Sequence, residues 1–154
     1  MIKAFKAILI VFALFLLPGS SFAQIIANPT TWTFEAKKKK GNEYQVLIHV
    51  KVNKGWHIWS LKPGGDGLQV PPSFAFKANP DIKLKGPIKE LGKPVVGPMD
   101  GVDGTVTYFL DNVDYVQDVT ISRNTVINCA YKYQVCDENM CLPQFKKKYF
   151  IAVT

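Results

Sequence analysis

The pattern that most constrains the fold is a period-two alternation of apolar and polar side chains, and it recurs along most of the chain. Its clearest instance is the segment 44–52, where every second residue is aromatic or β-branched. Alternate residues of a β-strand face the same side, so such a segment buries one face and exposes the other. No segment beyond the first 23 of the 154 residues has a helical period. The chain is therefore predicted to be all-β.

Short strand-like segments follow one another at even spacing, separated by turn residues. The predicted strands are 31–36, 44–52, 73–77, 82–84, 106–110, 113–121, 125–135 and 145–153. The segments 106–110 and 113–121 are expected to form a hairpin that turns at Asp111-Asn112. Seven or eight short strands in a chain of this length predict an immunoglobulin-like β-sandwich, with a small closed barrel as the alternative.

Two segments are rich in glycine and proline and are predicted to lack regular structure. The first is 62–67, with the sequence KPGGDG, and the second is 91–104. Long loops without secondary structure are often functional. The segment 91–104 is therefore a candidate lid or rim of a site.

The first 23 residues have the features of a secretory signal peptide. Lys3 and Lys6 precede an apolar run at 7–17, and small residues lead to a predicted cleavage site after Ala23. The apolar run is shorter than the ~20 residues that span a bilayer. We therefore expect residues 24–154 to form one exported domain that does not span the membrane.

The chain carries a formal net charge of +7, and much of the excess lies in two lysine runs. The runs are 37–40 and 146–148, and the first is followed by Gly41-Asn42, so it is predicted to be a solvated hairpin turn. No nucleic-acid-binding motif accompanies either run. Nucleic acid is therefore not expected as a partner.

Three cysteines are present, and two of them flank a short polar tip between predicted strands. Cys136 ends one strand and Cys141 opens the return, so their Cα atoms could lie within the roughly 4.4–6.8 Å that a disulfide needs. Outside the cytoplasm such a close pair is expected to oxidise. Cys129 is predicted to lie on the strand face of Tyr131 and Tyr133, as a buried and inert thiol, and the alternative is a disulfide that involves Cys129.

The role of this pair is open from the residues alone. A six-residue disulfide loop adds roughly 2 kcal/mol of stability, against about 4.7 kcal/mol for a hundred-residue loop, which makes it a weak staple. A tight pair near the surface is also accessible to exchange with another protein's thiolate. A Cu(I) site is a further alternative, because thiolate, thioether and imidazole groups bind copper. The candidate ligands are Cys136, Cys141 and Met140, with His57 or Met99.

Four runs of sequence carry a resemblance to a known family. They are YQVC at 133–136 followed by CLP at 141–143, with GWHIW at 55–59 and PSF at 72–74 as supporting runs. Together they resemble the N-terminal periplasmic domain of the thiol:disulfide interchange protein DsbD. Two features depart from the family pattern: the cysteine spacing is one residue shorter than in its best-known member, and Gln144 stands where a second proline is often found.

The resemblance implies an immunoglobulin-like sandwich in which Cys136 and Cys141 are the redox pair and Cys141 attacks the partner. It also implies that Tyr108 and Phe109 form an aromatic cap that shields the disulfide. Electrons would come from a membrane-embedded donor and pass to thioredoxin-like periplasmic proteins, with no cofactor. The family's membrane and thioredoxin-like domains are not found in this sequence, so both partners are expected on separate chains.

The expected function is therefore that of a thiol–disulfide oxidoreductase module. The alternative is a non-enzymatic immunoglobulin-like binding module, with a structural disulfide or a Cu(I) site.

Overall fold

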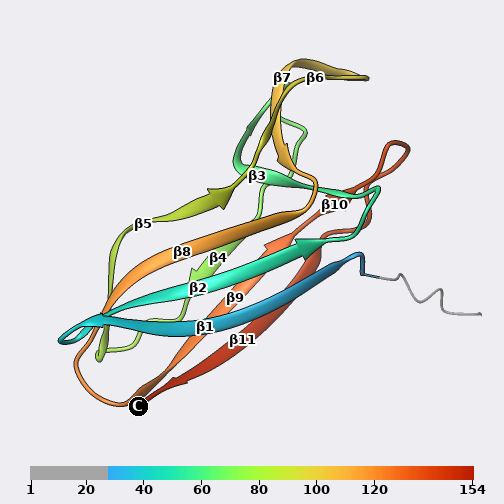
Figure 1. Ribbon diagram of the computed structural model, residues 1–154. Coiled ribbons are helices and arrows are strands. Elements are labelled where there is room, and N and C mark those ends of the chain that lie inside the picture. The colour runs from blue at the N-terminus through green and yellow to red at the C-terminus, as the bar shows by residue number, and fades with distance from the viewer. Residues whose placement is uncertain (1–27) are drawn as a thin grey trace, which may run out of the picture.

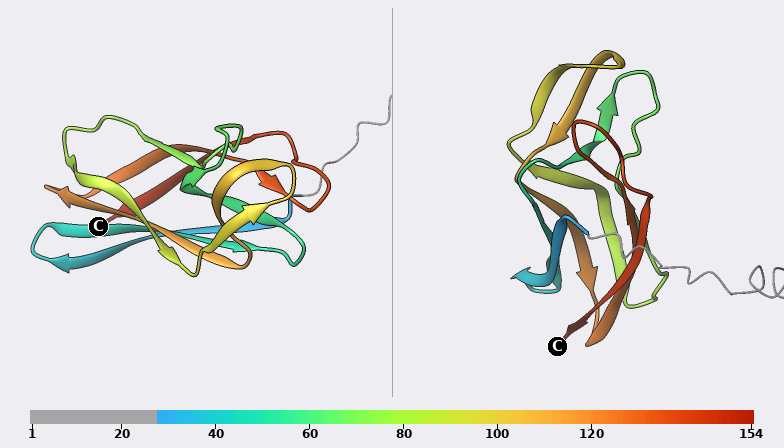
Figure 2. Two further views of the ribbon diagram at one scale, coloured as in Figure 1. Left: turned by 90° about the horizontal axis from the view of Figure 1, so that it is seen from above. Right: turned by 90° about the vertical axis from the view of Figure 1, so that its right-hand side faces the viewer.

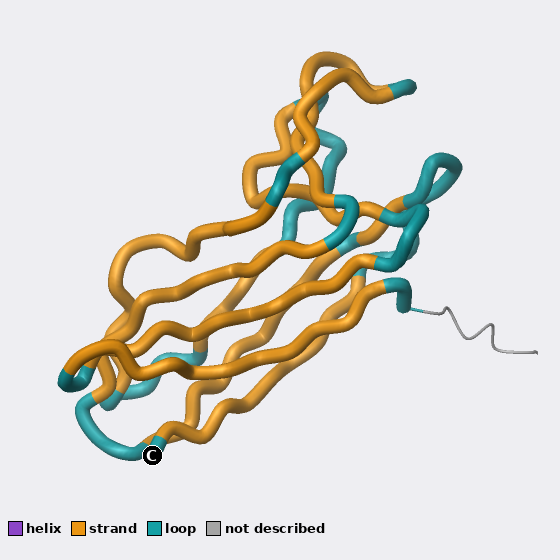
Figure 3. Tube along the Cα trace, viewed as in Figure 1, coloured by secondary structure: helices purple, strands orange, loops and turns teal. Residues whose placement is uncertain are grey.

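The structure, a computed structural model, describes residues 28–154, and these contain eleven strands and no helix (Figure 3). The all-β prediction is confirmed. The predicted signal peptide and its cleavage site lie outside the described residues. The strands are β1 (Thr30–Lys40), β2 (Glu43–Val52), β3 (His57–Gly64), β4 (Ser73–Phe76), β5 (Ile82–Gly92), β6 (Val95–Met99), β7 (Val102–Phe109), β8 (Asn112–Ile121), β9 (Thr125–Tyr133), β10 (Val135–Cys136) and β11 (Phe145–Val153).

The strands form a two-layered sandwich with a third sheet at one end (Figure 1). One layer is the antiparallel sheet β1-β2-β8-β5, and the other is β11-β9-β4. The third sheet is β10-β3-β7-β6, and its strands β6 and β7 stand at the upper end of the view in Figure 1. Each of these sheets is open, with two edge strands, so the immunoglobulin-like sandwich is confirmed over the closed barrel.

Alternation along the strands builds the core between the two layers. In β2 every second residue from Val46 to Val52 is buried, and in β9 the same holds from Ile127 to Tyr133. The Trp32 ring of β1 packs against the buried face of β9, and its centroid lies 4.5 Å from that of the Tyr133 ring. The long segments with the clearest alternation are thus the ones that hold the two layers together.

The predicted hairpin between 106–110 and 113–121 is wrong. β7 pairs with β3 and β6, whereas β8 pairs with β2 and β5. Because both edges of β8 already have partners, no edge is left for β7. The chain crosses between sheets at Leu110-Asp111, where the Asp111 carbonyl accepts a hydrogen bond from the Val52 amide at 2.7 Å. This crossing carries β7 to the end of the sandwich.

The prediction of an irregular segment at 91–104 is also wrong. β5 continues to Gly92, and β6 and β7 then pair as a hairpin around Asp100-Gly101. Gly101 has a φ of +76°, which glycine adopts without strain. Pro98 fits within β6 because β6 is an edge strand and Pro98 lies at the register shift between Gly97 and Met99.

Two further predictions of turns need correction. β3 extends to Gly64, so the segment 62–67 begins as strand, and Pro63 falls in a bulge after Trp59 where β3 does not pair with β7. The lysines at 37–40 complete β1 as exposed strand residues, and only the two residues that follow form the turn. Lysine side chains at these positions extend into solvent, so they do not oppose strand pairing.

The bulge in β3 is held from two sides. The Glu90 carboxylate of β5 accepts hydrogen bonds from the Ser60 hydroxyl at 2.5 Å and the Leu61 amide at 2.8 Å. Gly64 has a φ of +73°, and a Cβ atom there would lie 2.5 Å from the Thr105 carbonyl oxygen. β3 therefore reaches β7 along a path that needs both the carboxylate and the glycine.

Candidate redox site

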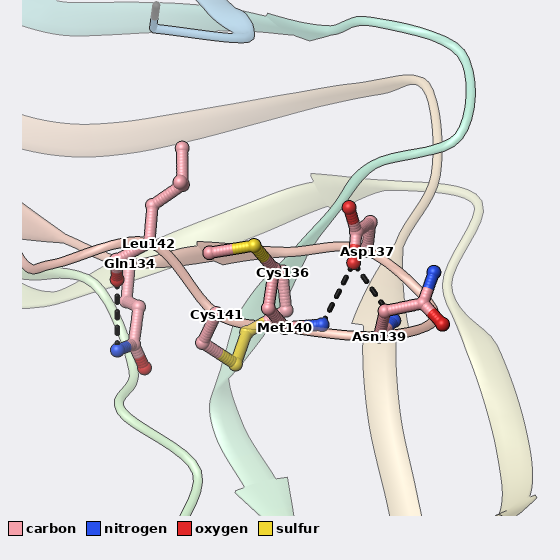
Figure 4. Close-up of a disulfide and its surroundings, with 7 residues drawn as sticks. All are labelled: Gln134, Cys136, Asp137, Asn139, Met140, Cys141 and Leu142. Carbon is pink, nitrogen blue, oxygen red and sulfur yellow. Dashed lines mark hydrogen bonds between the residues drawn. A yellow bond between two sulfur atoms is a disulfide. The ribbon is translucent and has the colours of Figure 1, made fainter. Parts of the chain in front are cut away.

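A disulfide joins Cys136 and Cys141 across a four-residue turn, with their Cα atoms 3.9 Å apart (Figure 4). The turn is closed on both sides of the bond. The Asp137 amide donates to the Met140 carbonyl at 2.9 Å, and the Leu142 amide donates to the Val135 carbonyl at 2.9 Å. The predicted pairing of these two cysteines is confirmed, at a Cα separation slightly below the usual range.

The Asp137 side chain fixes the shape of the turn from within. Its Oδ1 atom accepts hydrogen bonds from the amides of Asn139 and Met140, each at 2.8 Å (Figure 4). These two bonds lower the pKa of the Asp137 carboxyl. The carboxylate is therefore ionised at neutral pH, beside the disulfide.

The two cysteines differ in exposure. Cys136 is 2% exposed and belongs to β10, whereas Cys141 follows the turn and is exposed. Thiol–disulfide exchange requires a thiolate to approach one of the two sulfurs, so access decides which one is attacked. Residue exposure makes Cys141 the accessible end of this disulfide.

Cys136 lies in a small apolar cluster on the face of the end sheet that points away from the main core. Its fully buried partners are Trp59 of β3 and Val106 of β7. Met99 and Val102, on either side of the β6–β7 turn, pack against this cluster. The hairpin that the sequence prediction missed therefore helps to bury Cys136.

The predicted cap residues face opposite sides of β7, as neighbours in a strand do. Tyr108 packs against the cluster that contains Cys136, and its ring lies 5.0 Å from the His57 ring. Phe109 is 2% exposed, pairs with Ile58 and belongs to the main core. The structure thus brings Tyr108, but not Phe109, to the disulfide end, and shielding by Tyr108 stays a prediction.

His57 and Trp59 line the same cluster and are both buried. Their rings meet edge to face at 4.8 Å, with an interplanar angle of 78°. His57 Nε2 and Trp59 Nε1 are buried and have no hydrogen-bond partner within residues 28–154. Burial lowers the pKa of His57, and the nearby Asp137 carboxylate partly opposes this effect. No local sequence pattern indicates that these nitrogens lack partners.

The other histidine has a structural role. His49 Nδ1 lies 2.8 Å from Asp114 Oδ1, and His49 Nε2 lies 3.5 Å from Glu35 Oε1. The hydrogen bond to Asp114 raises the pKa of His49, and Glu35 adds to the effect. This ion-pair group lies on the β1-β2-β8-β5 sheet, away from the cysteines.

The third cysteine is buried as predicted. Cys129 is fully inaccessible within the main core and is not part of a disulfide. Burial raises the pKa of its thiol, which keeps it protonated at neutral pH. Its inertness in exchange stays a prediction.

The soft ligands that suggested copper lie in different surroundings. Met140 is in the turn and 54% exposed, whereas Met99 is packed against the Cys136 cluster. Within the described part of the chain, no three His, Cys, Asp or Glu side chains are grouped to hold a metal ion. The Cu(I) alternative stays a prediction.

Residues 28–154 also contain no helix that is long and apolar enough to cross a membrane.

The profile of the family described as thiol:disulfide interchange protein DsbD, N-terminal, matches residues 22–152. A search of curated protein sequences gives no match. Solved structures of similar fold include two N-terminal domains. One is the N-terminal periplasmic domain of ScsB from Proteus mirabilis, with a TM-score of 0.56, 15% identity, and coverage of 82% of this chain and 51% of that chain.

The other is the DsbD N-terminal domain of Neisseria meningitidis in the reduced form. It has a TM-score of 0.55 and 14% identity, and the match covers 92% of this chain and 93% of that chain. The chain therefore spans about half the length of the ScsB structure and nearly all of the Neisseria domain. At these identities the two structures bear on the fold alone, which is immunoglobulin-like.

Proposed function

The chain belongs to the family of DsbD N-terminal domains, and from that premise we propose that it is an exported thiol–disulfide exchange module. Cys136 and Cys141 are its redox pair. The observation that carries the proposal is the unequal exposure of a close disulfide at a tight turn, with Cys141 exposed and Cys136 buried. A bond that only cross-links strands has no need of one accessible sulfur.

Electron uptake begins when a donor thiolate attacks the Cys141 sulfur. A new disulfide forms between donor and Cys141, the bond to Cys136 breaks, and the electron pair leaves on the Cys136 sulfur. A second donor thiolate then attacks the donor sulfur of the mixed disulfide and releases Cys141 as a thiolate. The donor becomes a disulfide, and the module has gained two electrons.

Electron delivery uses the same two sulfurs in reverse. The Cys141 thiolate attacks an acceptor disulfide, and the first acceptor sulfur leaves as a thiolate. Cys136 then attacks the Cys141 sulfur, which restores the internal disulfide and releases the second acceptor thiolate. The sulfurs carry both electrons, so the reaction uses no cofactor. The Asp137-stabilised turn keeps Cys136 within reach of Cys141 throughout.

The proposed partners are a membrane-embedded donor and thioredoxin-like periplasmic acceptors, each on a separate chain. Family membership supports this choice. Thioredoxin-like proteins present an accessible thiolate of lowered pKa, which suits attack on an exposed sulfur. Next to Cys141, the exposed side chain of Met140 offers an apolar contact for such a partner. Flexible methionines suit surfaces that bind more than one partner.

Single-cysteine variants test which sulfur is attacked. With Cys129→Ala in both, Cys136→Ser leaves only Cys141 and Cys141→Ser leaves only Cys136. In oxidised glutathione, the Cys141 thiol should form a mixed disulfide much faster than the Cys136 thiol. Intact-mass analysis at successive times measures both rates. Equal rates in the two folded variants would contradict the assignment of Cys141 as the attacking residue.

A further inference from the structure

Two buried nitrogens beside the disulfide have no explanation in the oxidised structure. His57 Nε2 and Trp59 Nε1 lack hydrogen-bond partners among residues 28–154, although the two residues are 7% and 4% exposed. An unpaired buried polar group is destabilising, so such groups are rare and usually have a role. Both residues lie on β3, two positions apart, and so face the same side of the end sheet.

Cys136 lies on that same face. It is the direct cross-strand partner of His57 in the β10–β3 pair. Side chains of directly opposed residues share a face, with Cβ atoms about 4.5–5.5 Å apart. Cys136 and Trp59 also belong to the same buried cluster. The two residues that carry the unpaired nitrogens are therefore neighbours of Cys136, the less exposed cysteine of the pair.

Opening of the disulfide changes what this neighbourhood must hold. In the disulfide the Cys136 sulfur is uncharged and is only a weak acceptor. When Cys141 is attacked, the Cys136 sulfur leaves with a full negative charge in an apolar, buried cluster. A thiolate in such surroundings is strongly disfavoured unless hydrogen bonds stabilise it. The indole N–H is a donor only, and a neutral imidazole also carries one N–H.

We propose that the N–H groups of His57 and Trp59 are donors to the Cys136 thiolate, in a site that is filled only when the disulfide opens. The inference rests on the proposed exchange function, because that reaction forms this thiolate. The two donors make Cys136 a better leaving group during uptake. They also keep a fraction of Cys136 ionised, ready to attack Cys141 during delivery.

The charged and titratable groups around His57 favour its neutral form. Burial lowers the pKa of His57, and only Asp137 opposes this, from the turn. Tyr108 of β7 approaches as a ring, 5.0 Å away between centroids. In the disulfide form His57 is therefore neutral near pH 7, and its imidazole carries one N–H.

A thiolate titration tests the proposal without any partner protein. In a Cys129→Ala, Cys141→Ser background, Cys136 is the only thiol, and its ionisation is followed by absorbance at 240 nm. His57→Phe keeps a flat ring without the N–H, and Trp59→Phe removes the indole N–H. Each should raise the Cys136 pKa by about 1–2 units, as expected for one lost hydrogen bond to a charged group.

Two further variants separate hydrogen bonding from packing. His57→Gln retains a side-chain N–H and should keep most of the original Cys136 pKa. His49→Gln changes the distant histidine and should leave the Cys136 pKa unaltered. Near-UV circular dichroism confirms that each variant is folded, and Trp59→Phe decides the question if His57→Phe does not fold.

An unchanged Cys136 pKa in the folded His57→Phe and Trp59→Phe variants would overturn the inference. Equal shifts in His57→Gln and His57→Phe would overturn the role of the imidazole N–H. Because the titration needs no exchange, its failure is distinct from failure of the proposed function. A protein that never exchanges with glutathione, yet shows the expected pKa shifts, would refute the function and retain the thiolate site.

Discussion

Replacing Tyr108 and Phe109 with alanine, one at a time, should separate an effect on folding stability from an effect on protection of the disulfide. The two residues are adjacent in β7, but Tyr108 packs at the Cys136 cluster and Phe109 packs in the main core. Phe109 is 2% exposed, so Phe109→Ala should cost about 3–5 kcal/mol of unfolding free energy. For a domain of this size that corresponds to a Tm lower by about 10–20 °C.

Tyr108→Ala should have a smaller effect on stability, about 1–2 kcal/mol, because the side chain is only partly buried. Its main effect should be on access to Cys136. Removal of the ring opens the cluster, so a small thiol can attack the Cys136 sulfur as well as the Cys141 sulfur.

The assay treats each oxidised variant with reduced glutathione well below its unfolding temperature. Mixed disulfides are then trapped by acid and located by peptide mapping. The original protein and Phe109→Ala should carry glutathione almost entirely on Cys141. Tyr108→Ala should also carry it on Cys136 and should be reduced faster. Attack on Cys136 in Phe109→Ala, with none in Tyr108→Ala, would refute the assignment of the two residues.

Three other predictions concern the rest of the chain. His49→Gln removes an ion pair in which Asp114, with Glu35, raises the folded-state pKa of His49 above its unfolded value of about 6.5. Because these groups are exposed, the variant should be less stable by at most about 1 kcal/mol. In urea unfolding this difference should be full below about pH 6.5 and should vanish as pH rises through the folded-state pKa of His49. Gly64→Ala should destabilise the protein by about 1–3 kcal/mol, because it combines a φ of +73° with a Cβ clash; a neutral result in urea unfolding would mean that β3 takes another path. Exported protein should begin at Gln24 by intact-mass analysis, and retention of the apolar run would contradict cleavage.

Much of the sandwich could be predicted because its main strands are long and half-buried. The alternation in 44–52 and 125–135 matches β2 and β9, whose buried residues build the core. The cysteine pair could also be found from sequence, since both cysteines flank one local turn. Features that depend on nearby residues were therefore accessible without the structure.

One error concerns a choice between distant partners. β7 and β8 are adjacent in sequence, but β8 uses both of its edges for β2 and β5. The β6–β7 hairpin was missed because glycine and proline outweighed the Asp100-Gly101 turn signal. Figure 2 shows this hairpin at the same end of the molecule as β3 and the loop that contains the disulfide. The burial of Cys136 depends on that arrangement, which no local pattern encodes.

An equilibrium redox titration of the whole protein tests the central claim most directly. The protein is equilibrated in glutathione buffers of graded potential, its thiols are trapped by alkylation, and the products are counted by mass. Structural disulfides typically have potentials below about −300 mV and resist the glutathione pool. We expect one two-electron transition above that range, lost in Cys136→Ser and in Cys141→Ser and retained in Cys129→Ala. A Cys136–Cys141 bond that stays oxidised in every buffer until denaturant unfolds the protein would contradict the account and identify the disulfide as a staple.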